Sequence, residues 1–357
     1  MIMVILAILT YQMAIRNPPM RKEKLVESNR LYHYALSFYS ELLLGDSLAN
    51  MQALALFLIH ARNLPKPGSS WMLSSMILAR AIELGYHRSS NKIVLPIDQR
   101  NTLSIELRKR VFWSILSVQV TIAVKLGRPM AISAKDMDVE LPHAILDSEI
   151  TEQGVLSRSG NCDFWGHIFL SKKIPLLIDL YENVILVRKP EAEYHRDIEE
   201  LDAQITKWRH DWDRETANQP QNGSYQIETH LINLWYTEFR TLLHHPRLCT
   251  SHVPEVQEKN LDICLEASRS MLQSLTSLIA DFKGADFTWH FVSGYVLGMG
   301  MAMHVYSKRR DHLTEETLNK LRIELNEWFF VIRSADHFMS KCARTMPSTL
   351  LTIYRVW

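Results

Sequence analysis

The sequence predicts an all-α protein. Apolar residues recur at helical spacing along most of the 357 residues, and no convincing run alternates β-branched and polar residues between hairpin turns. Glycine and proline stand where these segments stop, as they do at helix ends. With 47% hydrophobic and 22% charged residues, the chain can bury a substantial core. We therefore expect an irregular multi-helical domain of roughly ten or more helices.

The first half of the chain is expected to form four helices, over residues 31–44, 48–63, 71–84 and 104–126. Asp46 and Ser47 can cap the second helix, and Ser69 or Ser70 can cap the third, because their side-chain oxygens accept hydrogen bonds from the first helical N–H groups. Gly45 and Gly85 are expected to end the first and third helices, and Gly127 with Pro129 the fourth, since glycine accepts the left-handed conformation that closes many helices.

Further amphipathic segments are expected at about 165–188, 194–214, 227–244, 255–281, 288–307 and 315–344. The stretch 147–163 has the weakest periodicity of the chain, so we place a joint there. The expected organisation is an apolar and basic N-terminal extension over 1–30, a core region over 31–145, a loop over 146–163, and a second helical half over 164–357 that packs on the first. No fixed repeat indicates a solenoid.

The apolar run from Met1 to Ile15 has several interpretations. It is shorter than the roughly 20 residues that span a bilayer, and Arg16 and Arg21 follow it, whereas the positive charge of a secretory signal precedes its apolar run. A core or docking helix, an artefact of where the chain begins, a secretory signal and a membrane attachment all remain open. No other segment approaches membrane length without charges, so we expect no membrane partner.

Charge and cysteine content give no support to several classes of site. The 40 Lys and Arg residues balance 39 Asp and Glu residues, which gives no broad attraction for a phosphate backbone. The four cysteines lie far apart in the sequence and form no C-x-x-C pair: Cys162, Cys249, Cys264 and Cys342. Neither a metal site nor a disulfide scaffold is indicated, and we expect no cofactor in this chain.

Catalytic motifs are also missing from the sequence. It contains no G-x-S-x-G elbow, no H-E-x-x-H pair, no phosphate-cradling glycine motif and no D-D-x-x-D motif. The fifteen histidines, including the adjacent His244 and His245, show no recognised zinc spacing and are expected to be structural or exposed. We expect no catalytic residue and interpret the chain as not being an enzyme.

Three ordered stretches carry a family resemblance. The first runs from Trp71 to Arg88 and closes L-G-Y-H-R; the second begins E-L-R-K-R-V-F-W at Glu106 and closes L-G-R-P-M-A-I at Ile132; the third is D-M-D-V-E-L-P, ending at Pro142. Together they resemble the fungal-specific transcription factor domain. The positions that match its motifs, which we take as candidate structural or regulatory residues, are Trp71, Gly85, His87, Arg88, Arg110, Trp113, Gly127, Arg128, Pro129, Asp138 and Pro142.

The resemblance is weaker beyond Pro142 and extends over roughly 30–345. The segment 234–248 is similar to a second-half helix of the family that ends in an H-R-P-like turn, with His245 where arginine is common. Gln119 and Val120 stand where many members have Asp and Arg, so an ion pair built on those positions is absent.

Two basic features have competing interpretations. Arg128 follows a helix-stopping glycine, where its guanidinium can meet the last helical carbonyls, so we favour a structural clamp over an effector-binding arginine. Arg108, Lys109 and Arg110 are successive residues on a helix and point in different directions. We expect them to be solvated or salt-bridged rather than to bind nucleic acid.

The resemblance implies the regulatory half of a zinc-cluster factor that controls RNA polymerase II transcription in a fungal nucleus. Zinc and DNA binding would belong to a cysteine-rich module that this chain does not contain, so we expect these residues alone not to bind DNA. The implied partners are transcriptional machinery or regulatory proteins, a small-molecule effector, and a second copy of the chain. The rival interpretation is a helical enzyme or a small-molecule or lipid-binding protein with a central apolar cavity.

Overall fold

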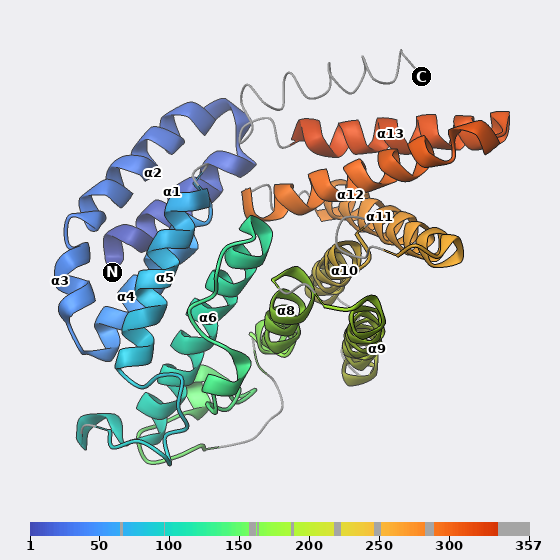
Figure 1. Cartoon of the computed structure of the whole chain (residues 1–357). Helices are drawn as coiled ribbons and strands as arrows, with labels where there is room; N and C mark the ends of the chain where they lie inside the picture. Colours follow the sequence, from blue (N-terminus) through green and yellow to red (C-terminus); the bar gives the residue numbers. More distant parts are fainter. Residues whose placement is uncertain are drawn as a thin grey trace. The chain divides into compact units, whose positions relative to one another are not determined.

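The computed structural model describes residues 1–64, 67–95, 97–156, 162, 164–186, 189–217, 223–245, 251–282 and 289–334. These residues are mainly helical, and an isolated bridge between Ile150 and Val155 is the one β-type pairing among them (Figure 1). The expected all-α, multi-helical fold is confirmed. None of the described helices is long and apolar enough to cross a membrane.

The chain divides into two compact units, Met1–Asp179 and Leu180–Trp357. This boundary lies later than the weakly periodic stretch 146–163 that the sequence suggested as a joint. It falls within a helix rather than in a loop, which explains why a search for weak helical periodicity does not find it.

The first unit is built from helices α1 (Ile2–Arg16), α2 (Arg21–Leu36), α3 (Tyr39–Leu44), α4 (Leu48–Ala61), α5 (Pro67–Glu83), α6 (Thr102–Leu126), α7 (Trp165–Ser171) and α8 (Ile174–Leu180). Local capping chemistry sets several of their ends. The Ser47 hydroxyl accepts a hydrogen bond from the Asn50 amide at 3.2 Å, and Gly85 and Gly127 adopt the expected left-handed backbone, with φ of 73° and 58°. Gly45 ends α3, but the left-handed conformation expected there is wrong, because its backbone is extended, with φ of −73° and ψ of 152°.

Three expected helix boundaries are wrong. The segment 31–44 is interrupted by a turn at Ser37 and Phe38, and its first part belongs to the longer α2. Ser69 and Ser70 lie inside α5 rather than capping it, because the helix begins at Pro67, whose fixed φ suits a first helical position. The segment 165–188 is divided into α7, α8 and a π-helical turn over Tyr181–Ile185.

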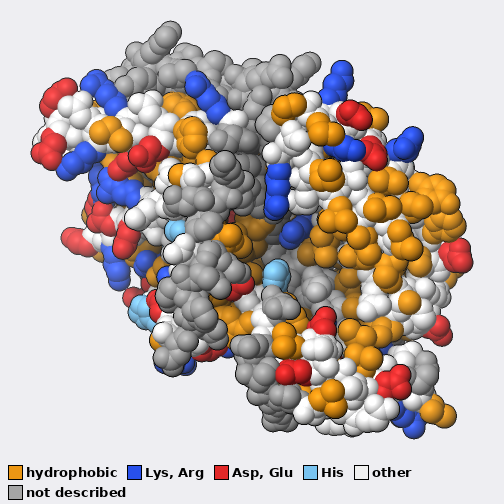
Figure 2. Space-filling view, turned by 180° about the vertical axis from the view of Figure 1, so that it is seen from behind, with side chains coloured by type: hydrophobic (Ala, Val, Ile, Leu, Met, Phe, Trp, Pro, Cys, Tyr) orange, Lys and Arg blue, Asp and Glu red, His pale blue; other side chains and the backbone are white. Residues whose placement is uncertain are grey.

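The apolar N-terminal run is a packed helix of the first unit. Val4 and Ala7 of α1 are fully buried, and the Ser28 hydroxyl of α2 donates to the Ala7 carbonyl at 2.7 Å. The opposite face of α1 remains uncovered among the described residues, with Ile2 71% and Leu9 54% exposed. Figure 2 shows a broad hydrophobic surface on the side where the N-terminal helices lie. One face of α1 therefore belongs to the core of the first unit, as the core-helix interpretation predicted, and the other face is exposed among the described residues.

The second unit contains α9 (Glu191–Thr216), α10 (Gly223–Leu243), α11 (Pro254–Phe282), α12 (Trp289–Lys308) and α13 (Glu315–Ser334). The buried residues of α9 recur every three or four positions and form one apolar stripe: Tyr194, Ile198, Leu201, Ile205, Trp208, Trp212 and Thr216. Residues of α10, α11, α12 and α13 share a second core that includes Met271, Met299 and Trp328. The part of the last expected helix beyond 334 lies outside the described residues.

Candidate functional site

The tryptophan that opens the first motif contacts the elbow that closes the second. The Trp71 indole N–H of α5 donates to the Pro129 carbonyl at 3.3 Å, and the Arg128 guanidinium carbon lies 5.9 Å from the centre of the Trp71 ring. This contact joins positions 58 residues apart in the sequence. Two of the ordered motifs therefore belong to one packed body, as the resemblance implied.

The role expected for the Arg128 side chain needs correction. The backbone N–H groups of Gly127 and Arg128 close α6, donating to the carbonyls of Val124 and Ala123 at 3.1 and 2.9 Å. The guanidinium itself faces Trp71, and the residue is exposed. The backbone of the Gly127–Arg128 turn, rather than the arginine side chain, thus satisfies the helix end.

We expect Arg128→Ala to lower the free energy of unfolding by no more than about 1 kcal/mol, because an exposed cation–π contact is weak. Thermal unfolding of the variant and the wild-type chain would measure this change. Gly127→Ala is the matched comparison: its positive φ strains any side chain, so it should destabilise the chain more than Arg128→Ala does. The reverse order would show that the guanidinium holds the elbow.

The acidic third motif is bound to the turn that closes the first motif. The backbone N–H groups of Asp138 and Val139 both donate to the His87 carbonyl at 3.2 Å. In return, the Ser89 N–H donates to Asp138 Oδ1 at 2.8 Å and the Ser89 hydroxyl donates to Glu140 Oε1 at 2.7 Å. We call this pairing of residues 87–89 with residues 138–140 the turn–tail clasp.

Basic side chains strengthen the turn–tail clasp. Lys92 Nζ lies 2.8 Å and Arg88 Nη2 lies 3.1 Å from Asp138 Oδ2. The hydrogen bond from Lys92, followed by that from the Ser89 amide, lowers the pKa of Asp138 below its usual value. The hydrogen bond from Ser89 likewise lowers the pKa of Glu140. Both carboxylates are therefore ionised at neutral pH.

Helix α6 holds the same tail from its other side. The Trp113 indole N–H donates to the Glu140 carbonyl at 3.0 Å, and Lys109 Nζ lies 3.3 Å from Glu140 Oε2. Arg108 donates to the Leu84 carbonyl at 2.9 Å and stacks 3.8 Å from the centre of the Tyr86 ring. The first turn, the acidic tail and α6 thus form one network.

Two residues of the basic triplet of α6, Lys109 and Arg110, are salt-bridged, which was one of the expected roles. Arg108 instead donates to Gln99 and to the Leu84 carbonyl, and the triplet does not form a solvated face. Arg108 is only 7% and Lys109 only 8% exposed. Each residue of the triplet points toward a different partner, as successive helical positions require. Their charges are used inside the first unit, which agrees with the expectation that they do not form a nucleic-acid-binding patch.

Glu106, which was not among the candidate residues, holds the chain directly after the acidic third motif. The Glu106 side chain is 3% exposed and accepts hydrogen bonds from the His143 backbone N–H at 2.9 Å and from Arg110 Nε at 3.2 Å. Its second oxygen lies 2.8 Å from His143 Nδ1. Arg110 also forms an ion pair with Asp147, with 2.6 Å between Nη1 and Oδ1. Glu106 opens the second motif, so its motif position could have identified it.

The remaining candidate residues take supporting positions. His87 contributes its backbone carbonyl to the turn–tail clasp, and burial, followed by the nearby charge of Arg88, lowers the pKa of its ring. Pro142 is buried directly before His143, where the chain leaves the clasp. The three motifs therefore converge, and what they build is a bonded frame rather than an array of reactive groups.

The second unit has its own polar junction, formed by residues of α9, α10 and α11. Arg240 Nε donates to Asp202 Oδ1 at 2.8 Å, and His244 lies 3.3 Å from Asp202 through Nε2 and 2.9 Å from Asn260 Oδ1 through Nδ1. Burial alone would raise the pKa of Asp202, but the neighbouring His244 ring and the hydrogen bonds from Arg240 outweigh burial and lower this pKa to about 2. His244 therefore has a structural role, which was one of the two expected for the histidines. Residues 246–248, which complete the second-half segment 234–248 of the resemblance, lie outside the described residues.

The described residues do not fit a zinc cluster. They contain no group of three or more His, Cys, Asp and Glu side chains that could hold a metal ion. Cys162 belongs to the first unit and Cys264 is buried in the second, while Cys249 and Cys342 lie outside the described residues.

Comparison with known proteins agrees with this arrangement. The family model described as "Fungal specific transcription factor domain" matches residues 2–210, more than half of the chain. The chain belongs to the fungal-specific transcription factor domain family. The match begins within α1 and ends within α9, so the domain starts earlier than the expected 30, and the weaker segment 234–248 lies outside it.

Curated relatives are fungal regulators. The Negative regulator of pleiotropic drug resistance STB5 of Candida glabrata is 32% identical over 33% of this chain and 12% of its own length. Activator of stress genes 1 of Saccharomyces cerevisiae is 23% identical over 65% of this chain and 24% of its own length, and Protein STB5 of the same yeast is 25% identical over 67% and 33%. The chain thus spans a third or less of the length of these relatives. No solved structure matches it.

These findings define a regulatory domain of the fungal transcription factor type. The rival interpretation as an enzyme receives no support from them, since the relatives are named as transcription regulators or as stress and drug-resistance regulators.

Proposed function

We propose that this chain acts in a fungal nucleus as the regulatory domain of a factor that controls RNA polymerase II transcription, through conformational changes coupled to an effector or a protein partner. DNA binding would be supplied by a separate module, and this part of the protein would carry out no chemistry. The turn–tail clasp is the observation that carries the proposal, because it uses the family motifs to bond α5, the acidic tail and α6 into one frame.

A clasp of this kind suits a switch. Its ion pairs from Arg88 and Lys92 to Asp138 lie near the surface, where the two basic side chains are 40% and 60% exposed, and each such pair contributes little alone. A partner or effector that binds the open and closed forms with different affinity would shift the equilibrium between them. The clasp would then report the bound state to whatever surface recruits the transcriptional machinery.

A transcription reporter tests this function. The chain is fused to an unrelated DNA-binding module in yeast, and transcription from a reporter carrying that module's sites is measured. We expect the fusion to change transcription relative to the module alone. Asp138→Asn should alter that output several-fold, because it removes the charge on which Ser89, Arg88 and Lys92 converge.

The matched control is Glu152→Gln, which neutralises an exposed carboxylate of the same unit outside the clasp. It should leave the output unchanged at equal protein abundance. A fusion that behaves like the bare DNA-binding module under all growth conditions would refute the regulatory role, and identical output from Asp138→Asn and Glu152→Gln would refute the role of the clasp.

A further inference from the structure

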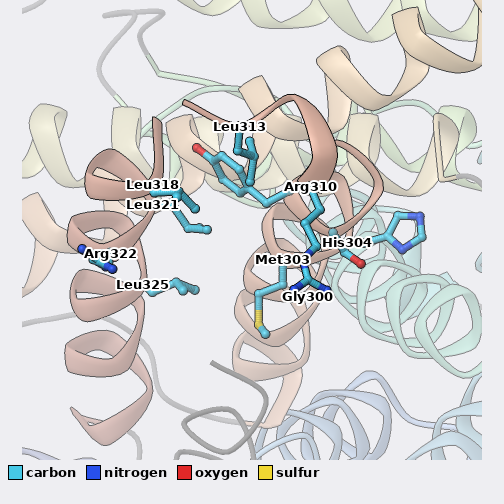
Figure 3. A pocket seen from close by; sticks show the side chains of 11 residues that line it. Gly300, Met303, His304, Arg310, Leu313, Leu318, Leu321, Arg322 and Leu325 are labelled. Carbon is cyan, nitrogen blue, oxygen red and sulfur yellow. The ribbon is translucent and has the colours of Figure 1, made fainter. Parts of the chain in front are cut away.

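The described residues contain a large apolar cavity and a small cationic one. The large cavity, of about 510 Å³, lies between α12 and α13, where the leucines of α13 form one wall (Figure 3). Its Arg310 already interacts with another residue of the chain, and the family match does not include it. The small cavity, of about 10 Å³, lies in the first unit at the turn–tail clasp, among the family motifs.

The small cavity is lined by basic side chains. Arg88, Arg108 and Lys109 line it, and none of the other described residues around it is Asp or Glu. The Tyr86 hydroxyl also belongs to its wall, where it is buried without a hydrogen-bond partner among the described residues. The volume suits one water-sized group. The cavity therefore offers donors to a single oxygen atom.

The cations at the cavity retain donors for a second acceptor. Arg88 Nη2 lies 3.1 Å from Asp138 Oδ2, and Lys109 Nζ lies 3.3 Å from Glu140 Oε2. A guanidinium carries five N–H donors and an ammonium group carries three, so each keeps N–H groups beyond those that face the carboxylates. The charge of Arg108 adds to theirs. An anionic oxygen can thus join the clasp without displacing its existing ion pairs.

Ser90 is placed to deliver such an oxygen. It lines the cavity and is only partly buried, whereas Ser89 beside it is buried and donates its hydroxyl proton to Glu140. The chain that follows Ser90 is not helical, Lys92 is exposed, and Val94 is 90% exposed. An enzyme that modifies a hydroxyl group can therefore reach Ser90 more readily than Ser89.

We propose that Ser90 is a phosphorylation site, and that its phosphate group bonds to Arg88 and Lys109 and holds the turn–tail clasp closed. In this step the Ser90 oxygen forms a bond to the γ-phosphorus of a nucleoside triphosphate held by a protein kinase. The bond from this phosphorus to the bridging oxygen breaks, and the hydroxyl proton passes to a carboxylate of the kinase. The products are phosphoserine and a nucleoside diphosphate.

The phosphate group suits the site in charge and in size. Its oxygens are strong acceptors that form charge-assisted hydrogen bonds with basic side chains. One oxygen enters the small cavity, and the others remain at its mouth beside Arg88. The regulatory consequence of this modification rests on the proposed function, whereas the phosphate site itself does not.

Phosphoserine installed at position 90 of the whole chain by genetic encoding tests the site. We expect the melting temperature of the first unit to rise by about 3–6 °C, because the new bonds join two segments of that unit. The control is phosphoserine at Ser37, an exposed residue at the C-terminal end of α2, where an anion is unfavourable. It should give no rise. A melting temperature that phosphoserine at position 90 leaves unchanged or lowers would overturn the proposal.

Inorganic phosphate distinguishes a covalent group from a free ion. Added to the unmodified chain, it should not reproduce the rise in melting temperature, because the cavity is too small for the whole ion. An equal rise with inorganic phosphate would overturn the assignment to a modified serine.

Phosphorus NMR measures the surroundings of the phosphate group directly. The second pKa of phosphoserine is about 6, and neighbouring cations lower it. We expect a lower value at position 90 than at position 37. Asp138 and Glu140 act in the opposite direction but are themselves paired with cations, and Asp136 accepts from the Ser133 N–H. A pKa at position 90 that is equal to or above the value at position 37 would overturn the proposal.

Two matched variants locate the phosphate group. Arg88 and Lys92 both contact Asp138, but only Arg88 lines the cavity. In the chain with phosphoserine at position 90, Arg88→Gln should therefore raise the pKa of the phosphate group more than Lys92→Gln does. The reverse order would place the phosphate outside the cavity and overturn the assignment.

The reporter fusion tests the regulation. Mass spectrometry of the fusion recovered from yeast should find phosphate on Ser90 under a growth condition that changes reporter output, and Ser90→Ala should remove both the phosphate and that change. Absence of phosphate from Ser90 under every growth condition would overturn the proposal. If the fusion regulates transcription equally with Ser90→Ala, the proposed function stands and regulation through Ser90 fails. If the fusion behaves like the bare DNA-binding module, the proposed function fails, while melting and NMR still decide the phosphate site.

Discussion

Glu106→Gln is expected to destabilise the first unit by about 3 kcal/mol, because it removes one partner from a buried ionic network. The amide keeps the size of the carboxylate, and its one oxygen can still accept from Arg110 and from the His143 backbone N–H, but the negative charge beside Arg110 is lost and an NH2 group replaces the oxygen that faces His143 Nδ1. For a unit of this size, the loss should lower the melting temperature by roughly 6–12 °C in calorimetry or circular dichroism.

Glu152→Gln serves as the control for this change, since that carboxylate is exposed and the same atoms are exchanged. It should shift the melting temperature by no more than about 1 °C. If Glu106→Gln had the same melting temperature as Glu152→Gln, the first unit would not depend on the buried carboxylate of Glu106. The double variant Glu106→Gln with Arg110→Met should recover part of the loss, because the arginine would no longer be left buried beside an uncharged partner.

Stability is expected to fall by about 3 kcal/mol as the pH falls from about 6.5 to about 4, because of His60. Burial, followed by the charge of His33, lowers the pKa of His60 from 6.5 to about 4. The unfolded chain therefore binds a proton in this pH window that the folded chain does not. The contribution is fully present above about pH 6.5, is lost as the pH falls, and changes no further below about pH 4.

The environment of His60 explains this resistance to protonation. The residue is fully buried, its ring stacks on Tyr32 at 4.3 Å, and neither ring nitrogen has a hydrogen-bond partner among the described residues. His60→Phe, which keeps an aromatic ring in the stack, should remove most of the slope in a plot of unfolding free energy against pH. His33→Gln, at an exposed position of the same unit, should retain most of it, because burial is the larger cause of the lowered pKa of His60 and the charge of His33 the smaller one. A slope of equal size in both variants would contradict the assignment to His60.

Features that depend on local backbone chemistry could be predicted from the sequence. Gly85 and Gly127 end their helices in the expected conformation, and Ser47 caps α4, because these preferences act within a few residues. The contact between Trp71 and Pro129 could also be anticipated, since the family motifs imply one body. The positions of Ser69 and Ser70 could not, because Pro67 offers an equally good helix start.

Features that depend on tertiary packing escaped sequence analysis. Nothing in the triplet Arg108, Lys109 and Arg110 indicates that its first two members are buried, since their partners lie in the first turn and the acidic tail. The close approach at Gly298 is equally hidden, because a Cβ atom there would meet the Met271 sulfur at 2.8 Å and the Trp328 ring at 3.1 Å, and both residues lie on other helices.

The bonds at Pro129 and Asp138 have a consequence for how this family can vary. Trp71 holds the chain at the first position, and the His87 carbonyl holds it at the second. Surface loops commonly tolerate insertions, but a residue added between these two anchors would move the carboxylates of Asp138 and Glu140 away from their partners. Homologues should therefore differ freely in the residue types between Pro129 and Asp138, but the number of residues between these two positions should hardly vary.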